Sequence, residues 1–120
     1  MAEHNEKGKF GEKLAEDYLI NHDYTVLHTN WRAKRYEVDI IAQKGDILVF
    51  CEVKYRSSNF FGEPESFVTK QKQRNIIKSA AMYVGRNCWR GEVRFDIISI
   101  LMKDETAKIN HIENAYGCTW

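Results

Sequence analysis

The chain has 120 residues, a formal net charge of +1, and 43% hydrophobic and 29% charged residues, a balance that suits one globular domain with a modest core. No apolar run approaches the roughly 20 residues that a membrane-spanning helix needs, and the polar N-terminus shows no secretory signal. The three cysteines are widely spaced and odd in number, which indicates free thiols of a reducing compartment, so we expect a cytoplasmic protein that binds no membrane.

The first predicted element is a helix from about Lys7 to Asn21, preceded by a polar segment, 1–7, that should be frayed. Apolar residues recur in this helix at the spacing of a stripe that faces a core. They are Phe10, Leu14, Ala15, Tyr18 and Leu19. Glu12 lies at the edge of the stripe, so it is the acid of this helix that is placed to touch a sheet. The residues alone favour a carboxylate at the rim of the core.

A β-prone run from Tyr24 to Thr29 predicts the first strand. Residues 30–36 carry three cations and two aromatic rings, and we expect them to form a loop. Basic side chains bind phosphates, and aromatic rings stack on unpaired bases. Because this segment directly precedes two acidic strands, we expect three of its residues to contact phosphate: Arg32, Lys34 and Arg35.

Two apolar runs, 37–42 and 47–54, flank a polar turn that contains Gly45, and this pattern predicts a β-hairpin. The runs carry four charges that a buried strand normally excludes: Glu37, Asp39, Glu52 and Lys54. Side chains alternate between the two faces of a strand, and an even-numbered turn places odd positions of the first strand beside even positions of the second. All four charges should therefore lie on one face of the hairpin.

A buried charge is unfavourable unless it is paired or binds a metal. Two neighbouring carboxylates repel each other, and a divalent cation removes that repulsion. Asp39 and Glu52 are therefore candidate metal ligands, and Lys54 is placed to hold or polarise a water beside the metal. These groups suit metal-assisted hydrolysis of a phosphodiester. From the residues alone, a surface sheet with a charged outer face is an equally good interpretation.

After the hairpin, residues 55–64 predict a loop, in which Arg56 is in line with the charges of the second hairpin strand. A second helix should begin at Pro64 or Ser66 and end at Val84. Lys72 lies early in this helix, at a position that would bring its side chain to a cleft beside the charged face of the hairpin.

The C-terminal part predicts two more strands. A turn at 85–87 and a loop precede a strand from Glu92 to Leu101, and a polar edge strand follows from Lys108 to Glu113, with a tail at 114–120. Asp96 is a buried-looking acid that should form a salt bridge with Arg94 or a lysine. The complete order of elements is helix, strand, hairpin, helix, strand, strand.

The run Glu37-Val38-Asp39-Ile40-Ile41-Ala42 followed by Glu52-Val53-Lys54 resembles the core motif of PD-(D/E)xK nucleases. The chain from about Gly8 to Ile100 is similar to the YraN-like family of small bacterial proteins, which are similar to archaeal Holliday junction resolvases. Further matching residues include Gly11, Glu12, Asn30, Arg32, Gly62, Pro64, Lys72, Tyr83, Arg94 and Asp96. Tyr36 departs from the pattern, because the family usually has glycine before the Glu-x-Asp.

This resemblance implies an α/β, restriction-endonuclease-like fold, with a mixed sheet flanked by helices and a single domain over residues 1–120. It implies a metal-dependent endonuclease that acts on DNA, branched or structured DNA in particular. A homodimer would suit an enzyme that cuts two symmetric strands. A tyrosine at position 36 would narrow or reshape the mouth of the site.

The same resemblance implies roles for individual residues. Asp39, Glu52 and the main-chain carbonyl of Val53 would bind Mg²⁺ or Mn²⁺. The catalytic set would be Glu12, Asp39, Glu52 and Lys54. The phosphate backbone would be held by Arg32, Lys34, Arg35, Arg56 and Lys72.

Two other functions compete with this one. A nucleic-acid-binding module or scaffold of the same fold, without catalysis, is favoured by Tyr36 and disfavoured by acids clustered toward a polyanion. A metal-dependent phosphohydrolase of small molecules is the third interpretation. It would lack the steep salt dependence of binding that a polyanionic ligand gives.

Overall fold

The computed structural model describes residues 2–57 and 68–117. Its elements, in chain order, are α1 (Ala2–Asn21), β1 (Thr25–Ala33), β2 (Tyr36–Lys44), β3 (Ile47–Ser57), α2 (Lys70–Asn87), β4 (Glu92–Lys103) and β5 (Thr106–Tyr116). The five strands form one sheet in the order β1-β2-β3-β4-β5, in which β3 and β4 are parallel and every other neighbouring pair is antiparallel. The predicted fold class, α/β with a mixed sheet flanked by helices, is confirmed, and so is the predicted order of elements.

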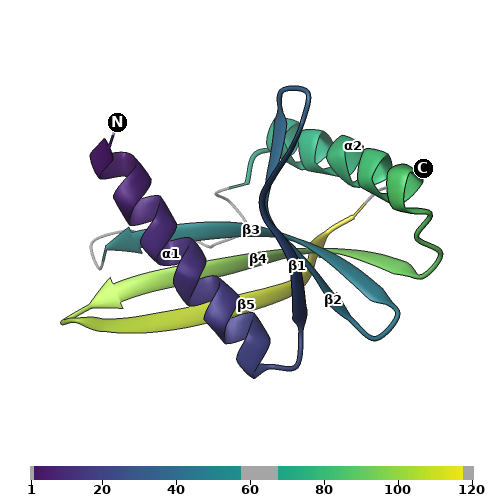
Figure 1. Ribbon diagram of the computed structural model, residues 1–120. Helices are drawn as coiled ribbons and strands as arrows, with labels where there is room; N and C mark the ends of the chain where they lie inside the picture. The colour runs from purple at the N-terminus through teal and green to yellow at the C-terminus, as the bar shows by residue number, and fades with distance from the viewer. Residues whose placement is uncertain (1, 58–67, 118–120) are drawn as a thin grey trace.

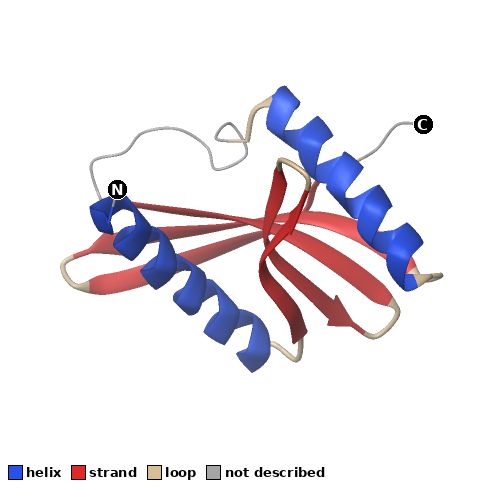
Figure 2. Ribbon diagram, turned by 45° about the horizontal axis from the view of Figure 1, so that its top comes forward, coloured by secondary structure: helices blue, strands red, loops and turns tan. Residues whose placement is uncertain are grey.

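The helices lie on opposite faces of the sheet (Figures 1 and 2). Phe50 of β3 is buried in a cluster with Ile76 of α2, and its neighbour Val49 is buried on the other face in a cluster with Leu19 of α1. Both faces of the central strands are thus covered. Among residues 2–57 and 68–117, no helix is long and apolar enough to cross a membrane.

Helix α1 begins five residues earlier than predicted, at Ala2, so residues 2–6, which were expected to precede the helix, are part of it. The predicted core stripe is confirmed for Ala15 and Leu19, which are fully buried. Phe10 remains 48% exposed. Its ring packs edge to face on Tyr55 of β3, with the ring centroids 5.8 Å apart.

The loop predicted at 30–36 is instead part of a second hairpin. β1 continues to Ala33, and Ala33 pairs with Tyr36, so that Lys34 and Arg35 alone make the turn. Lys34 adopts a left-handed backbone conformation with φ of 56° there. The polar composition of the segment misled the prediction, because pairing with β2 satisfies the backbone of β1 whatever its side chains are.

The C-terminal elements end later than predicted. α2 begins at Lys70 after the N-cap residue Thr69, so Val68 and Thr69 are not helical as predicted. The helix continues through the predicted turn at 85–87 to Asn87, and Cys88 takes the left-handed cap conformation. The predicted start at Pro64 or Ser66 lies outside the described residues, as does most of the loop predicted at 55–64. β4 matches its predicted start, and β5 extends to Tyr116, so the predicted tail is strand up to that residue.

Gly11 allows α1 to pass closely over β3. A methyl group at Gly11 would lie 2.9 Å from the Cβ atom of Tyr55, which is fixed to the strand backbone. At an open helical position, alanine in place of glycine stabilises by about 1 kcal/mol. Here we expect Gly11→Ala to lower the free energy of unfolding by about 1–3 kcal/mol, because the helix must move away from the sheet.

Urea unfolding measures this effect, and Gly85→Ala is its matched control. Gly85 also lies in a helix, and a methyl group added there meets nothing within 4 Å. We expect the control to gain stability. Equal gains for both variants would contradict the close approach at Gly11.

Candidate active site

The two predicted metal ligands lie where β2 and β3 separate. The ladder of backbone pairs between these strands ends at Ile40 and Cys51. Beyond it, the Val53 N–H donates a hydrogen bond to Asp39 Oδ2 at 2.9 Å. A carboxylate therefore takes the position of a strand carbonyl, and Asp39 and Glu52 both face the α2 side of the sheet, as the odd–even register predicted.

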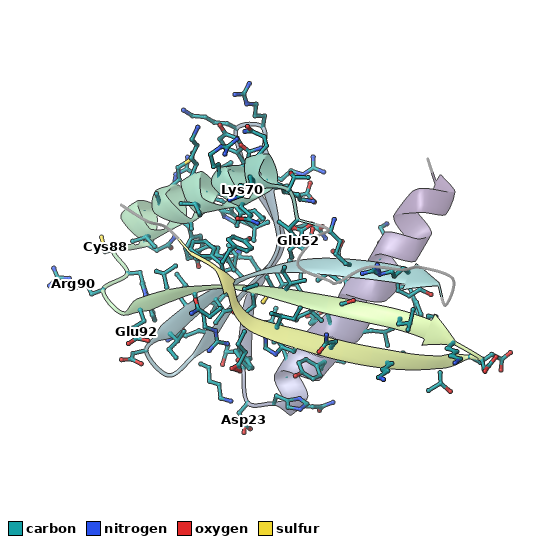
Figure 3. The ribbon with its side chains drawn as sticks, turned by 180° about the vertical axis from the view of Figure 1, so that it is seen from behind. Asp23, Glu52, Lys70, Cys88, Arg90 and Glu92 are labelled. Carbon is teal, nitrogen blue, oxygen red and sulfur yellow. The ribbon has the colours of Figure 1, made fainter. Side chains whose placement is uncertain are left out.

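Glu52 is 2% exposed, and it is neutralised by two lysines. Its Oε1 atom lies 2.5 Å from Lys72 Nζ and 3.4 Å from Lys54 Nζ. Figure 3 shows Glu52 near the end of α2 that Lys70 marks. Lys72 is the third residue of that helix, and its N–H donates to the hydroxyl of the N-cap residue Thr69 at 3.1 Å. This cap fixes the start of α2, and from that first turn the Lys72 side chain reaches the carboxylate of Glu52.

The cluster shifts the protonation equilibria of its members. Burial raises the pKa of Asp39 to about 7, the repulsion of Glu52 adds to this, and the Val53 N–H and Lys72 oppose it. Burial alone would lower the pKa of Lys72, but the contact with Glu52 and the field of Asp39 outweigh burial and raise it. Asp39 therefore holds a proton more readily than an ordinary aspartate does, while Lys72 stays an ammonium ion.

Glu12 and Glu37 border this cluster. Burial raises the pKa of Glu12, and Glu37 and Glu52 raise it further, against a hydrogen bond from the Asn30 side chain that lowers it. Glu12 therefore lies near enough to the acidic site for the charges of Glu37 and Glu52 to act on it. Glu37 of β2 forms an exposed ion pair with Arg32 of β1, with the charged atoms 3.1 Å apart. These two charges therefore compensate each other.

The acidic site opens into a pocket of about 420 Å³ between β2 and α2. Its polar wall includes Asp39, Glu52 and Lys72, and its rim includes Arg35 and Tyr36. Sequence reasoning missed three polar residues that line it, Thr69, Gln71 and Asn75. Only Thr69 had a detectable signal, since threonine before a helical run is a typical N-cap. No local signal distinguishes Gln71 and Asn75 from polar residues on a solvent-facing side of the helix.

The chemistry of these donors suits a hard divalent cation. Carboxylate and carbonyl oxygens are the ligands that Mg²⁺ and Mn²⁺ prefer. The pKa of Asp39 is raised chiefly by burial and further by the repulsion of Glu52, and a bound cation relieves repulsion of this kind. In the part of the chain that the structure describes, no group of three or more His, Cys, Asp or Glu side chains is arranged to hold a metal. The oxygen donors that would fit such a cation are the carboxylates of Asp39 and Glu52 and the Val53 carbonyl, and Lys72 already pairs with Glu52.

The other predicted phosphate contacts lie in two places. Lys34 and Arg35 form the tip of the β1–β2 hairpin, beside α2 (Figure 1). Arg56 lies farther along β3, where its guanidinium is 3.5 Å from Ser99 Oγ of β4 and burial lowers its pKa. The structure therefore places Arg35 and Lys72 in the lining of the pocket, Lys34 next to Arg35 at the hairpin tip, and Arg56 on a neighbouring part of the sheet.

One solved structure, SfsA of Pyrococcus furiosus in complex with Ca²⁺, is similar to this chain at a TM-score of 0.35 and 12% sequence identity, over 92% of this chain and 63% of that one. This similarity is too low to assign a fold or a function. Curated relatives are much closer. A UPF0102 protein of Flavobacterium psychrophilum is 47% identical over 97% of this chain and 98% of its own length.

Other relatives have a similar sequence identity over a similar share of the chain. A UPF0102 protein of Christiangramia forsetii is 45% identical over 97% of this chain and 98% of its own length, and one of Parabacteroides distasonis is 45% identical over 97% and 96%. The model of the uncharacterised protein family UPF0102, the YraN family, matches residues 11–100, which include the hairpin, the acidic site and Lys72. This chain therefore belongs to family UPF0102.

Proposed function

We propose that this protein is a metal-dependent endonuclease that hydrolyses phosphodiester bonds in DNA, with Mg²⁺ or Mn²⁺ as its cofactor. One observation carries the proposal. Asp39 and Glu52, two largely buried carboxylates on neighbouring strands, face one gap in the sheet beside the ammonium groups of Lys54 and Lys72. The resemblance of Glu52-Val53-Lys54 to the PD-(D/E)xK motif supports the same class of reaction.

Each residue of the site has a role in this proposal. Asp39, Glu52 and the Val53 carbonyl hold the cation, which when bound neutralises charge on the scissile phosphate. Lys54 orients the attacking water and assists its deprotonation. Glu12 accepts a hydrogen bond from the same water, which its raised pKa and its position near Glu52 support.

The basic residues position the nucleic acid. Arg32, Lys34, Arg35, Arg56 and Lys72 contact phosphates in this proposal. Contacts to phosphates fix the register of a strand but carry no sequence information. The enzyme therefore recognises the structure of DNA rather than its base sequence.

The test combines metal binding with cleavage. Isothermal titration with Mn²⁺ is made on the wild type and on the double variant Asp39→Asn, Glu52→Gln, and the same samples are incubated with branched, nicked and single-stranded DNAs. We expect the double variant to lose both Mn²⁺ binding and cleavage, because each substitution removes a charged oxygen ligand. Asparagine at position 39 keeps an acceptor for the Val53 N–H, so the sheet should stay intact.

The matched control replaces two acids on the solvent side of α1, as Glu16→Gln with Asp17→Asn. It removes the same charge without touching the site, since Asp17 pairs with Lys13 on the helix surface. The control should bind Mn²⁺ and cut like the wild type. A wild type that binds no Mn²⁺ at millimolar concentration with DNA present would sink the catalytic proposal.

A second candidate function is a nucleic-acid-binding scaffold without catalysis. Lys72 and Lys54 already neutralise Glu52, and this observation favours a site that is stable without a metal. The scaffold predicts DNA binding of equal strength in the wild type and the double variant, with no cleavage by either.

A further inference from the structure

A second pocket, of about 660 Å³, lies between the tip of the β1–β2 hairpin and α2. Lys34, Arg35, Tyr36, Lys78, Ala81 and Met82 line it. Its volume lies within the range of pockets that enclose small ligands, roughly 300–1,000 Å³. We call it the hairpin pocket.

From this pocket we infer that the protein binds an unpaired nucleotide of its DNA substrate there, with the base on Tyr36 and the adjoining phosphates on the surrounding cations. The inference rests on the proposed function, and it goes further in naming the class of substrate. That class is DNA with an unpaired nucleotide beside the cleaved bond, as in flaps, gaps and branch points, rather than continuous duplex.

The charge of the hairpin pocket suits a phosphate. Of the six described residues that line it, three are cations, Lys34, Arg35 and Lys78, and none is an acid. Lys34 is held at the hairpin tip by the tight turn, in its left-handed conformation. Lys78 approaches from the opposite wall, on α2, so that cations face the pocket from two elements.

The apolar part of the pocket suits a base. The Tyr36 ring is half-exposed and carries the Arg35 guanidinium 5.6 Å from its centroid. Ala81 and Met82 add apolar surface from α2. A base that stacks on the tyrosine ring gains affinity whatever its identity, because every base has a π face, and the nearby guanidinium adds a cation–π contact.

The hairpin pocket continues into the acidic site. Arg35 and Tyr36 line both pockets. Tyr36 and Asp39 are three residues apart on one strand, about 10 Å at the usual rise. A base on Tyr36 therefore lies beside the pocket that Asp39 and Glu52 line, and a base in a pocket is not paired in a duplex. The phosphodiester that reaches Asp39 and Glu52 is then one that adjoins an unpaired nucleotide.

The test measures binding without divalent cations, in EDTA, so that it does not depend on the metal. The probes are two duplexes of equal length that carry 2-aminopurine, one fully paired and one with the 2-aminopurine in a short single-stranded gap. We expect the wild type to bind the gapped probe about tenfold more tightly and to quench its fluorescence, as stacking on an aromatic ring does. Tyr36→Leu should lose this preference and keep its affinity for the paired probe, while Tyr36→Phe should retain the preference.

A pair of lysine variants tests the same pocket without changing the strand. Lys78 and Lys70 both lie exposed on α2, and only Lys78 lines either of the two pockets described above. Lys78→Glu should weaken binding of the gapped probe more than binding of the paired probe. Lys70→Glu, the matched control, should not change the ratio between them.

Equal affinity of the wild type for the two probes, or a preference that survives in both Tyr36→Leu and Lys78→Glu, would overturn the inference. Neither result bears on Asp39 and Glu52, whose role is judged by Mn²⁺ binding and by cleavage in the double variant. An enzyme that cuts paired and gapped DNA equally well would thus keep the proposed function and lose the hairpin pocket as a base site.

Discussion

Replacing Lys54 by methionine is expected to slow DNA cleavage by about 10²–10⁴-fold, the usual contribution of a group that orients a nucleophile and transfers its proton. Lys54 Nζ lies 3.4 Å from Glu52 Oε1, and the side chain is 28% exposed, so it reaches water and carboxylate together. Methionine keeps the length of the side chain and removes its charge. Single-turnover cleavage with saturating Mn²⁺ measures the loss.

Metal binding should persist in Lys54→Met, or become tighter, because the substitution removes a cation beside a proposed ligand. The fold should also persist, since Lys72 still neutralises Glu52. Lys44→Met serves as the control, at the turn end of the same hairpin. Cleavage within tenfold of the wild type would remove Lys54 from the mechanism, and rescue by Lys54→Arg would show that its charge matters rather than its proton.

The largest effect on stability is expected at Asp96, on the opposite side of the sheet from the acidic site. Its carboxylate is fully buried and accepts two hydrogen bonds from Arg94, both at 2.9 Å, and one from the Asn114 N–H at 3.0 Å. His111 Nε2 lies 2.6 Å away. The predicted salt bridge with Arg94 is therefore confirmed. It belongs to a larger network of hydrogen bonds that also joins β4 to β5 where the pairing of these two strands is irregular.

Asp96→Ala should lower the free energy of unfolding by about 3–5 kcal/mol, as when one partner of a buried ion pair is removed. Arg94 would lose the carboxylate that accepts its two hydrogen bonds, and the Asn114 N–H of β5 would lose its acceptor. Urea unfolding at neutral pH measures the change. Asp17→Ala, which breaks an exposed pair on α1, should have no measurable effect.

The contribution of Asp96 should also depend on pH. Burial alone would raise the pKa of this carboxyl, but hydrogen bonds from His111, Arg94 and the Asn114 amide outweigh burial and hold it below its ordinary value of 3.8. The folded state then binds fewer protons than the unfolded chain, so the stabilisation is complete above that ordinary value. It is lost as the pH falls through the lowered pKa.

The stabilities of the wild type and Asp96→Ala should therefore converge below about pH 4. The other titratable groups around the carboxylate are Tyr18, Tyr24 and Glu113, which are present in both proteins. If the difference in free energy of unfolding between the two proteins stays constant from pH 7 to pH 3, the charge of Asp96 is not what stabilises the sheet.

The acidic hairpin could be predicted because its signal is local. Alternating charges and apolar residues around a turn at Gly45 determine which side chains share a face, and the observed pairing of Ile40 with Cys51 has the predicted register. Side-chain alternation needs no information from the rest of the fold. Asp39 and Glu52 were therefore placed together correctly from sequence.

Long-range contacts could not be predicted in this way. Nothing near Asp96 in sequence indicates that His111 will approach it, or that Tyr24, 70 residues from Arg94, will accept a hydrogen bond from that arginine. Element ends were missed for a related reason. β1 continues past its β-prone run because β2 offers it a partner, and such pairing overrides local propensity. The position of Lys72 near the cleft came from the resemblance to the YraN-like family rather than from helical spacing.

One hydrogen bond makes the two acids of the site respond differently to selection. The Val53 amide of the sheet depends on Asp39 Oδ2, so selection for a stable fold and selection for chemistry act on the same side chain. Glu52 contacts other charged groups of the site, and these can be replaced together by apolar residues without loss of stability. If the proposed cleavage of DNA were lost in a lineage, position 39 would thus keep an acceptor and position 52 would lose its acid first.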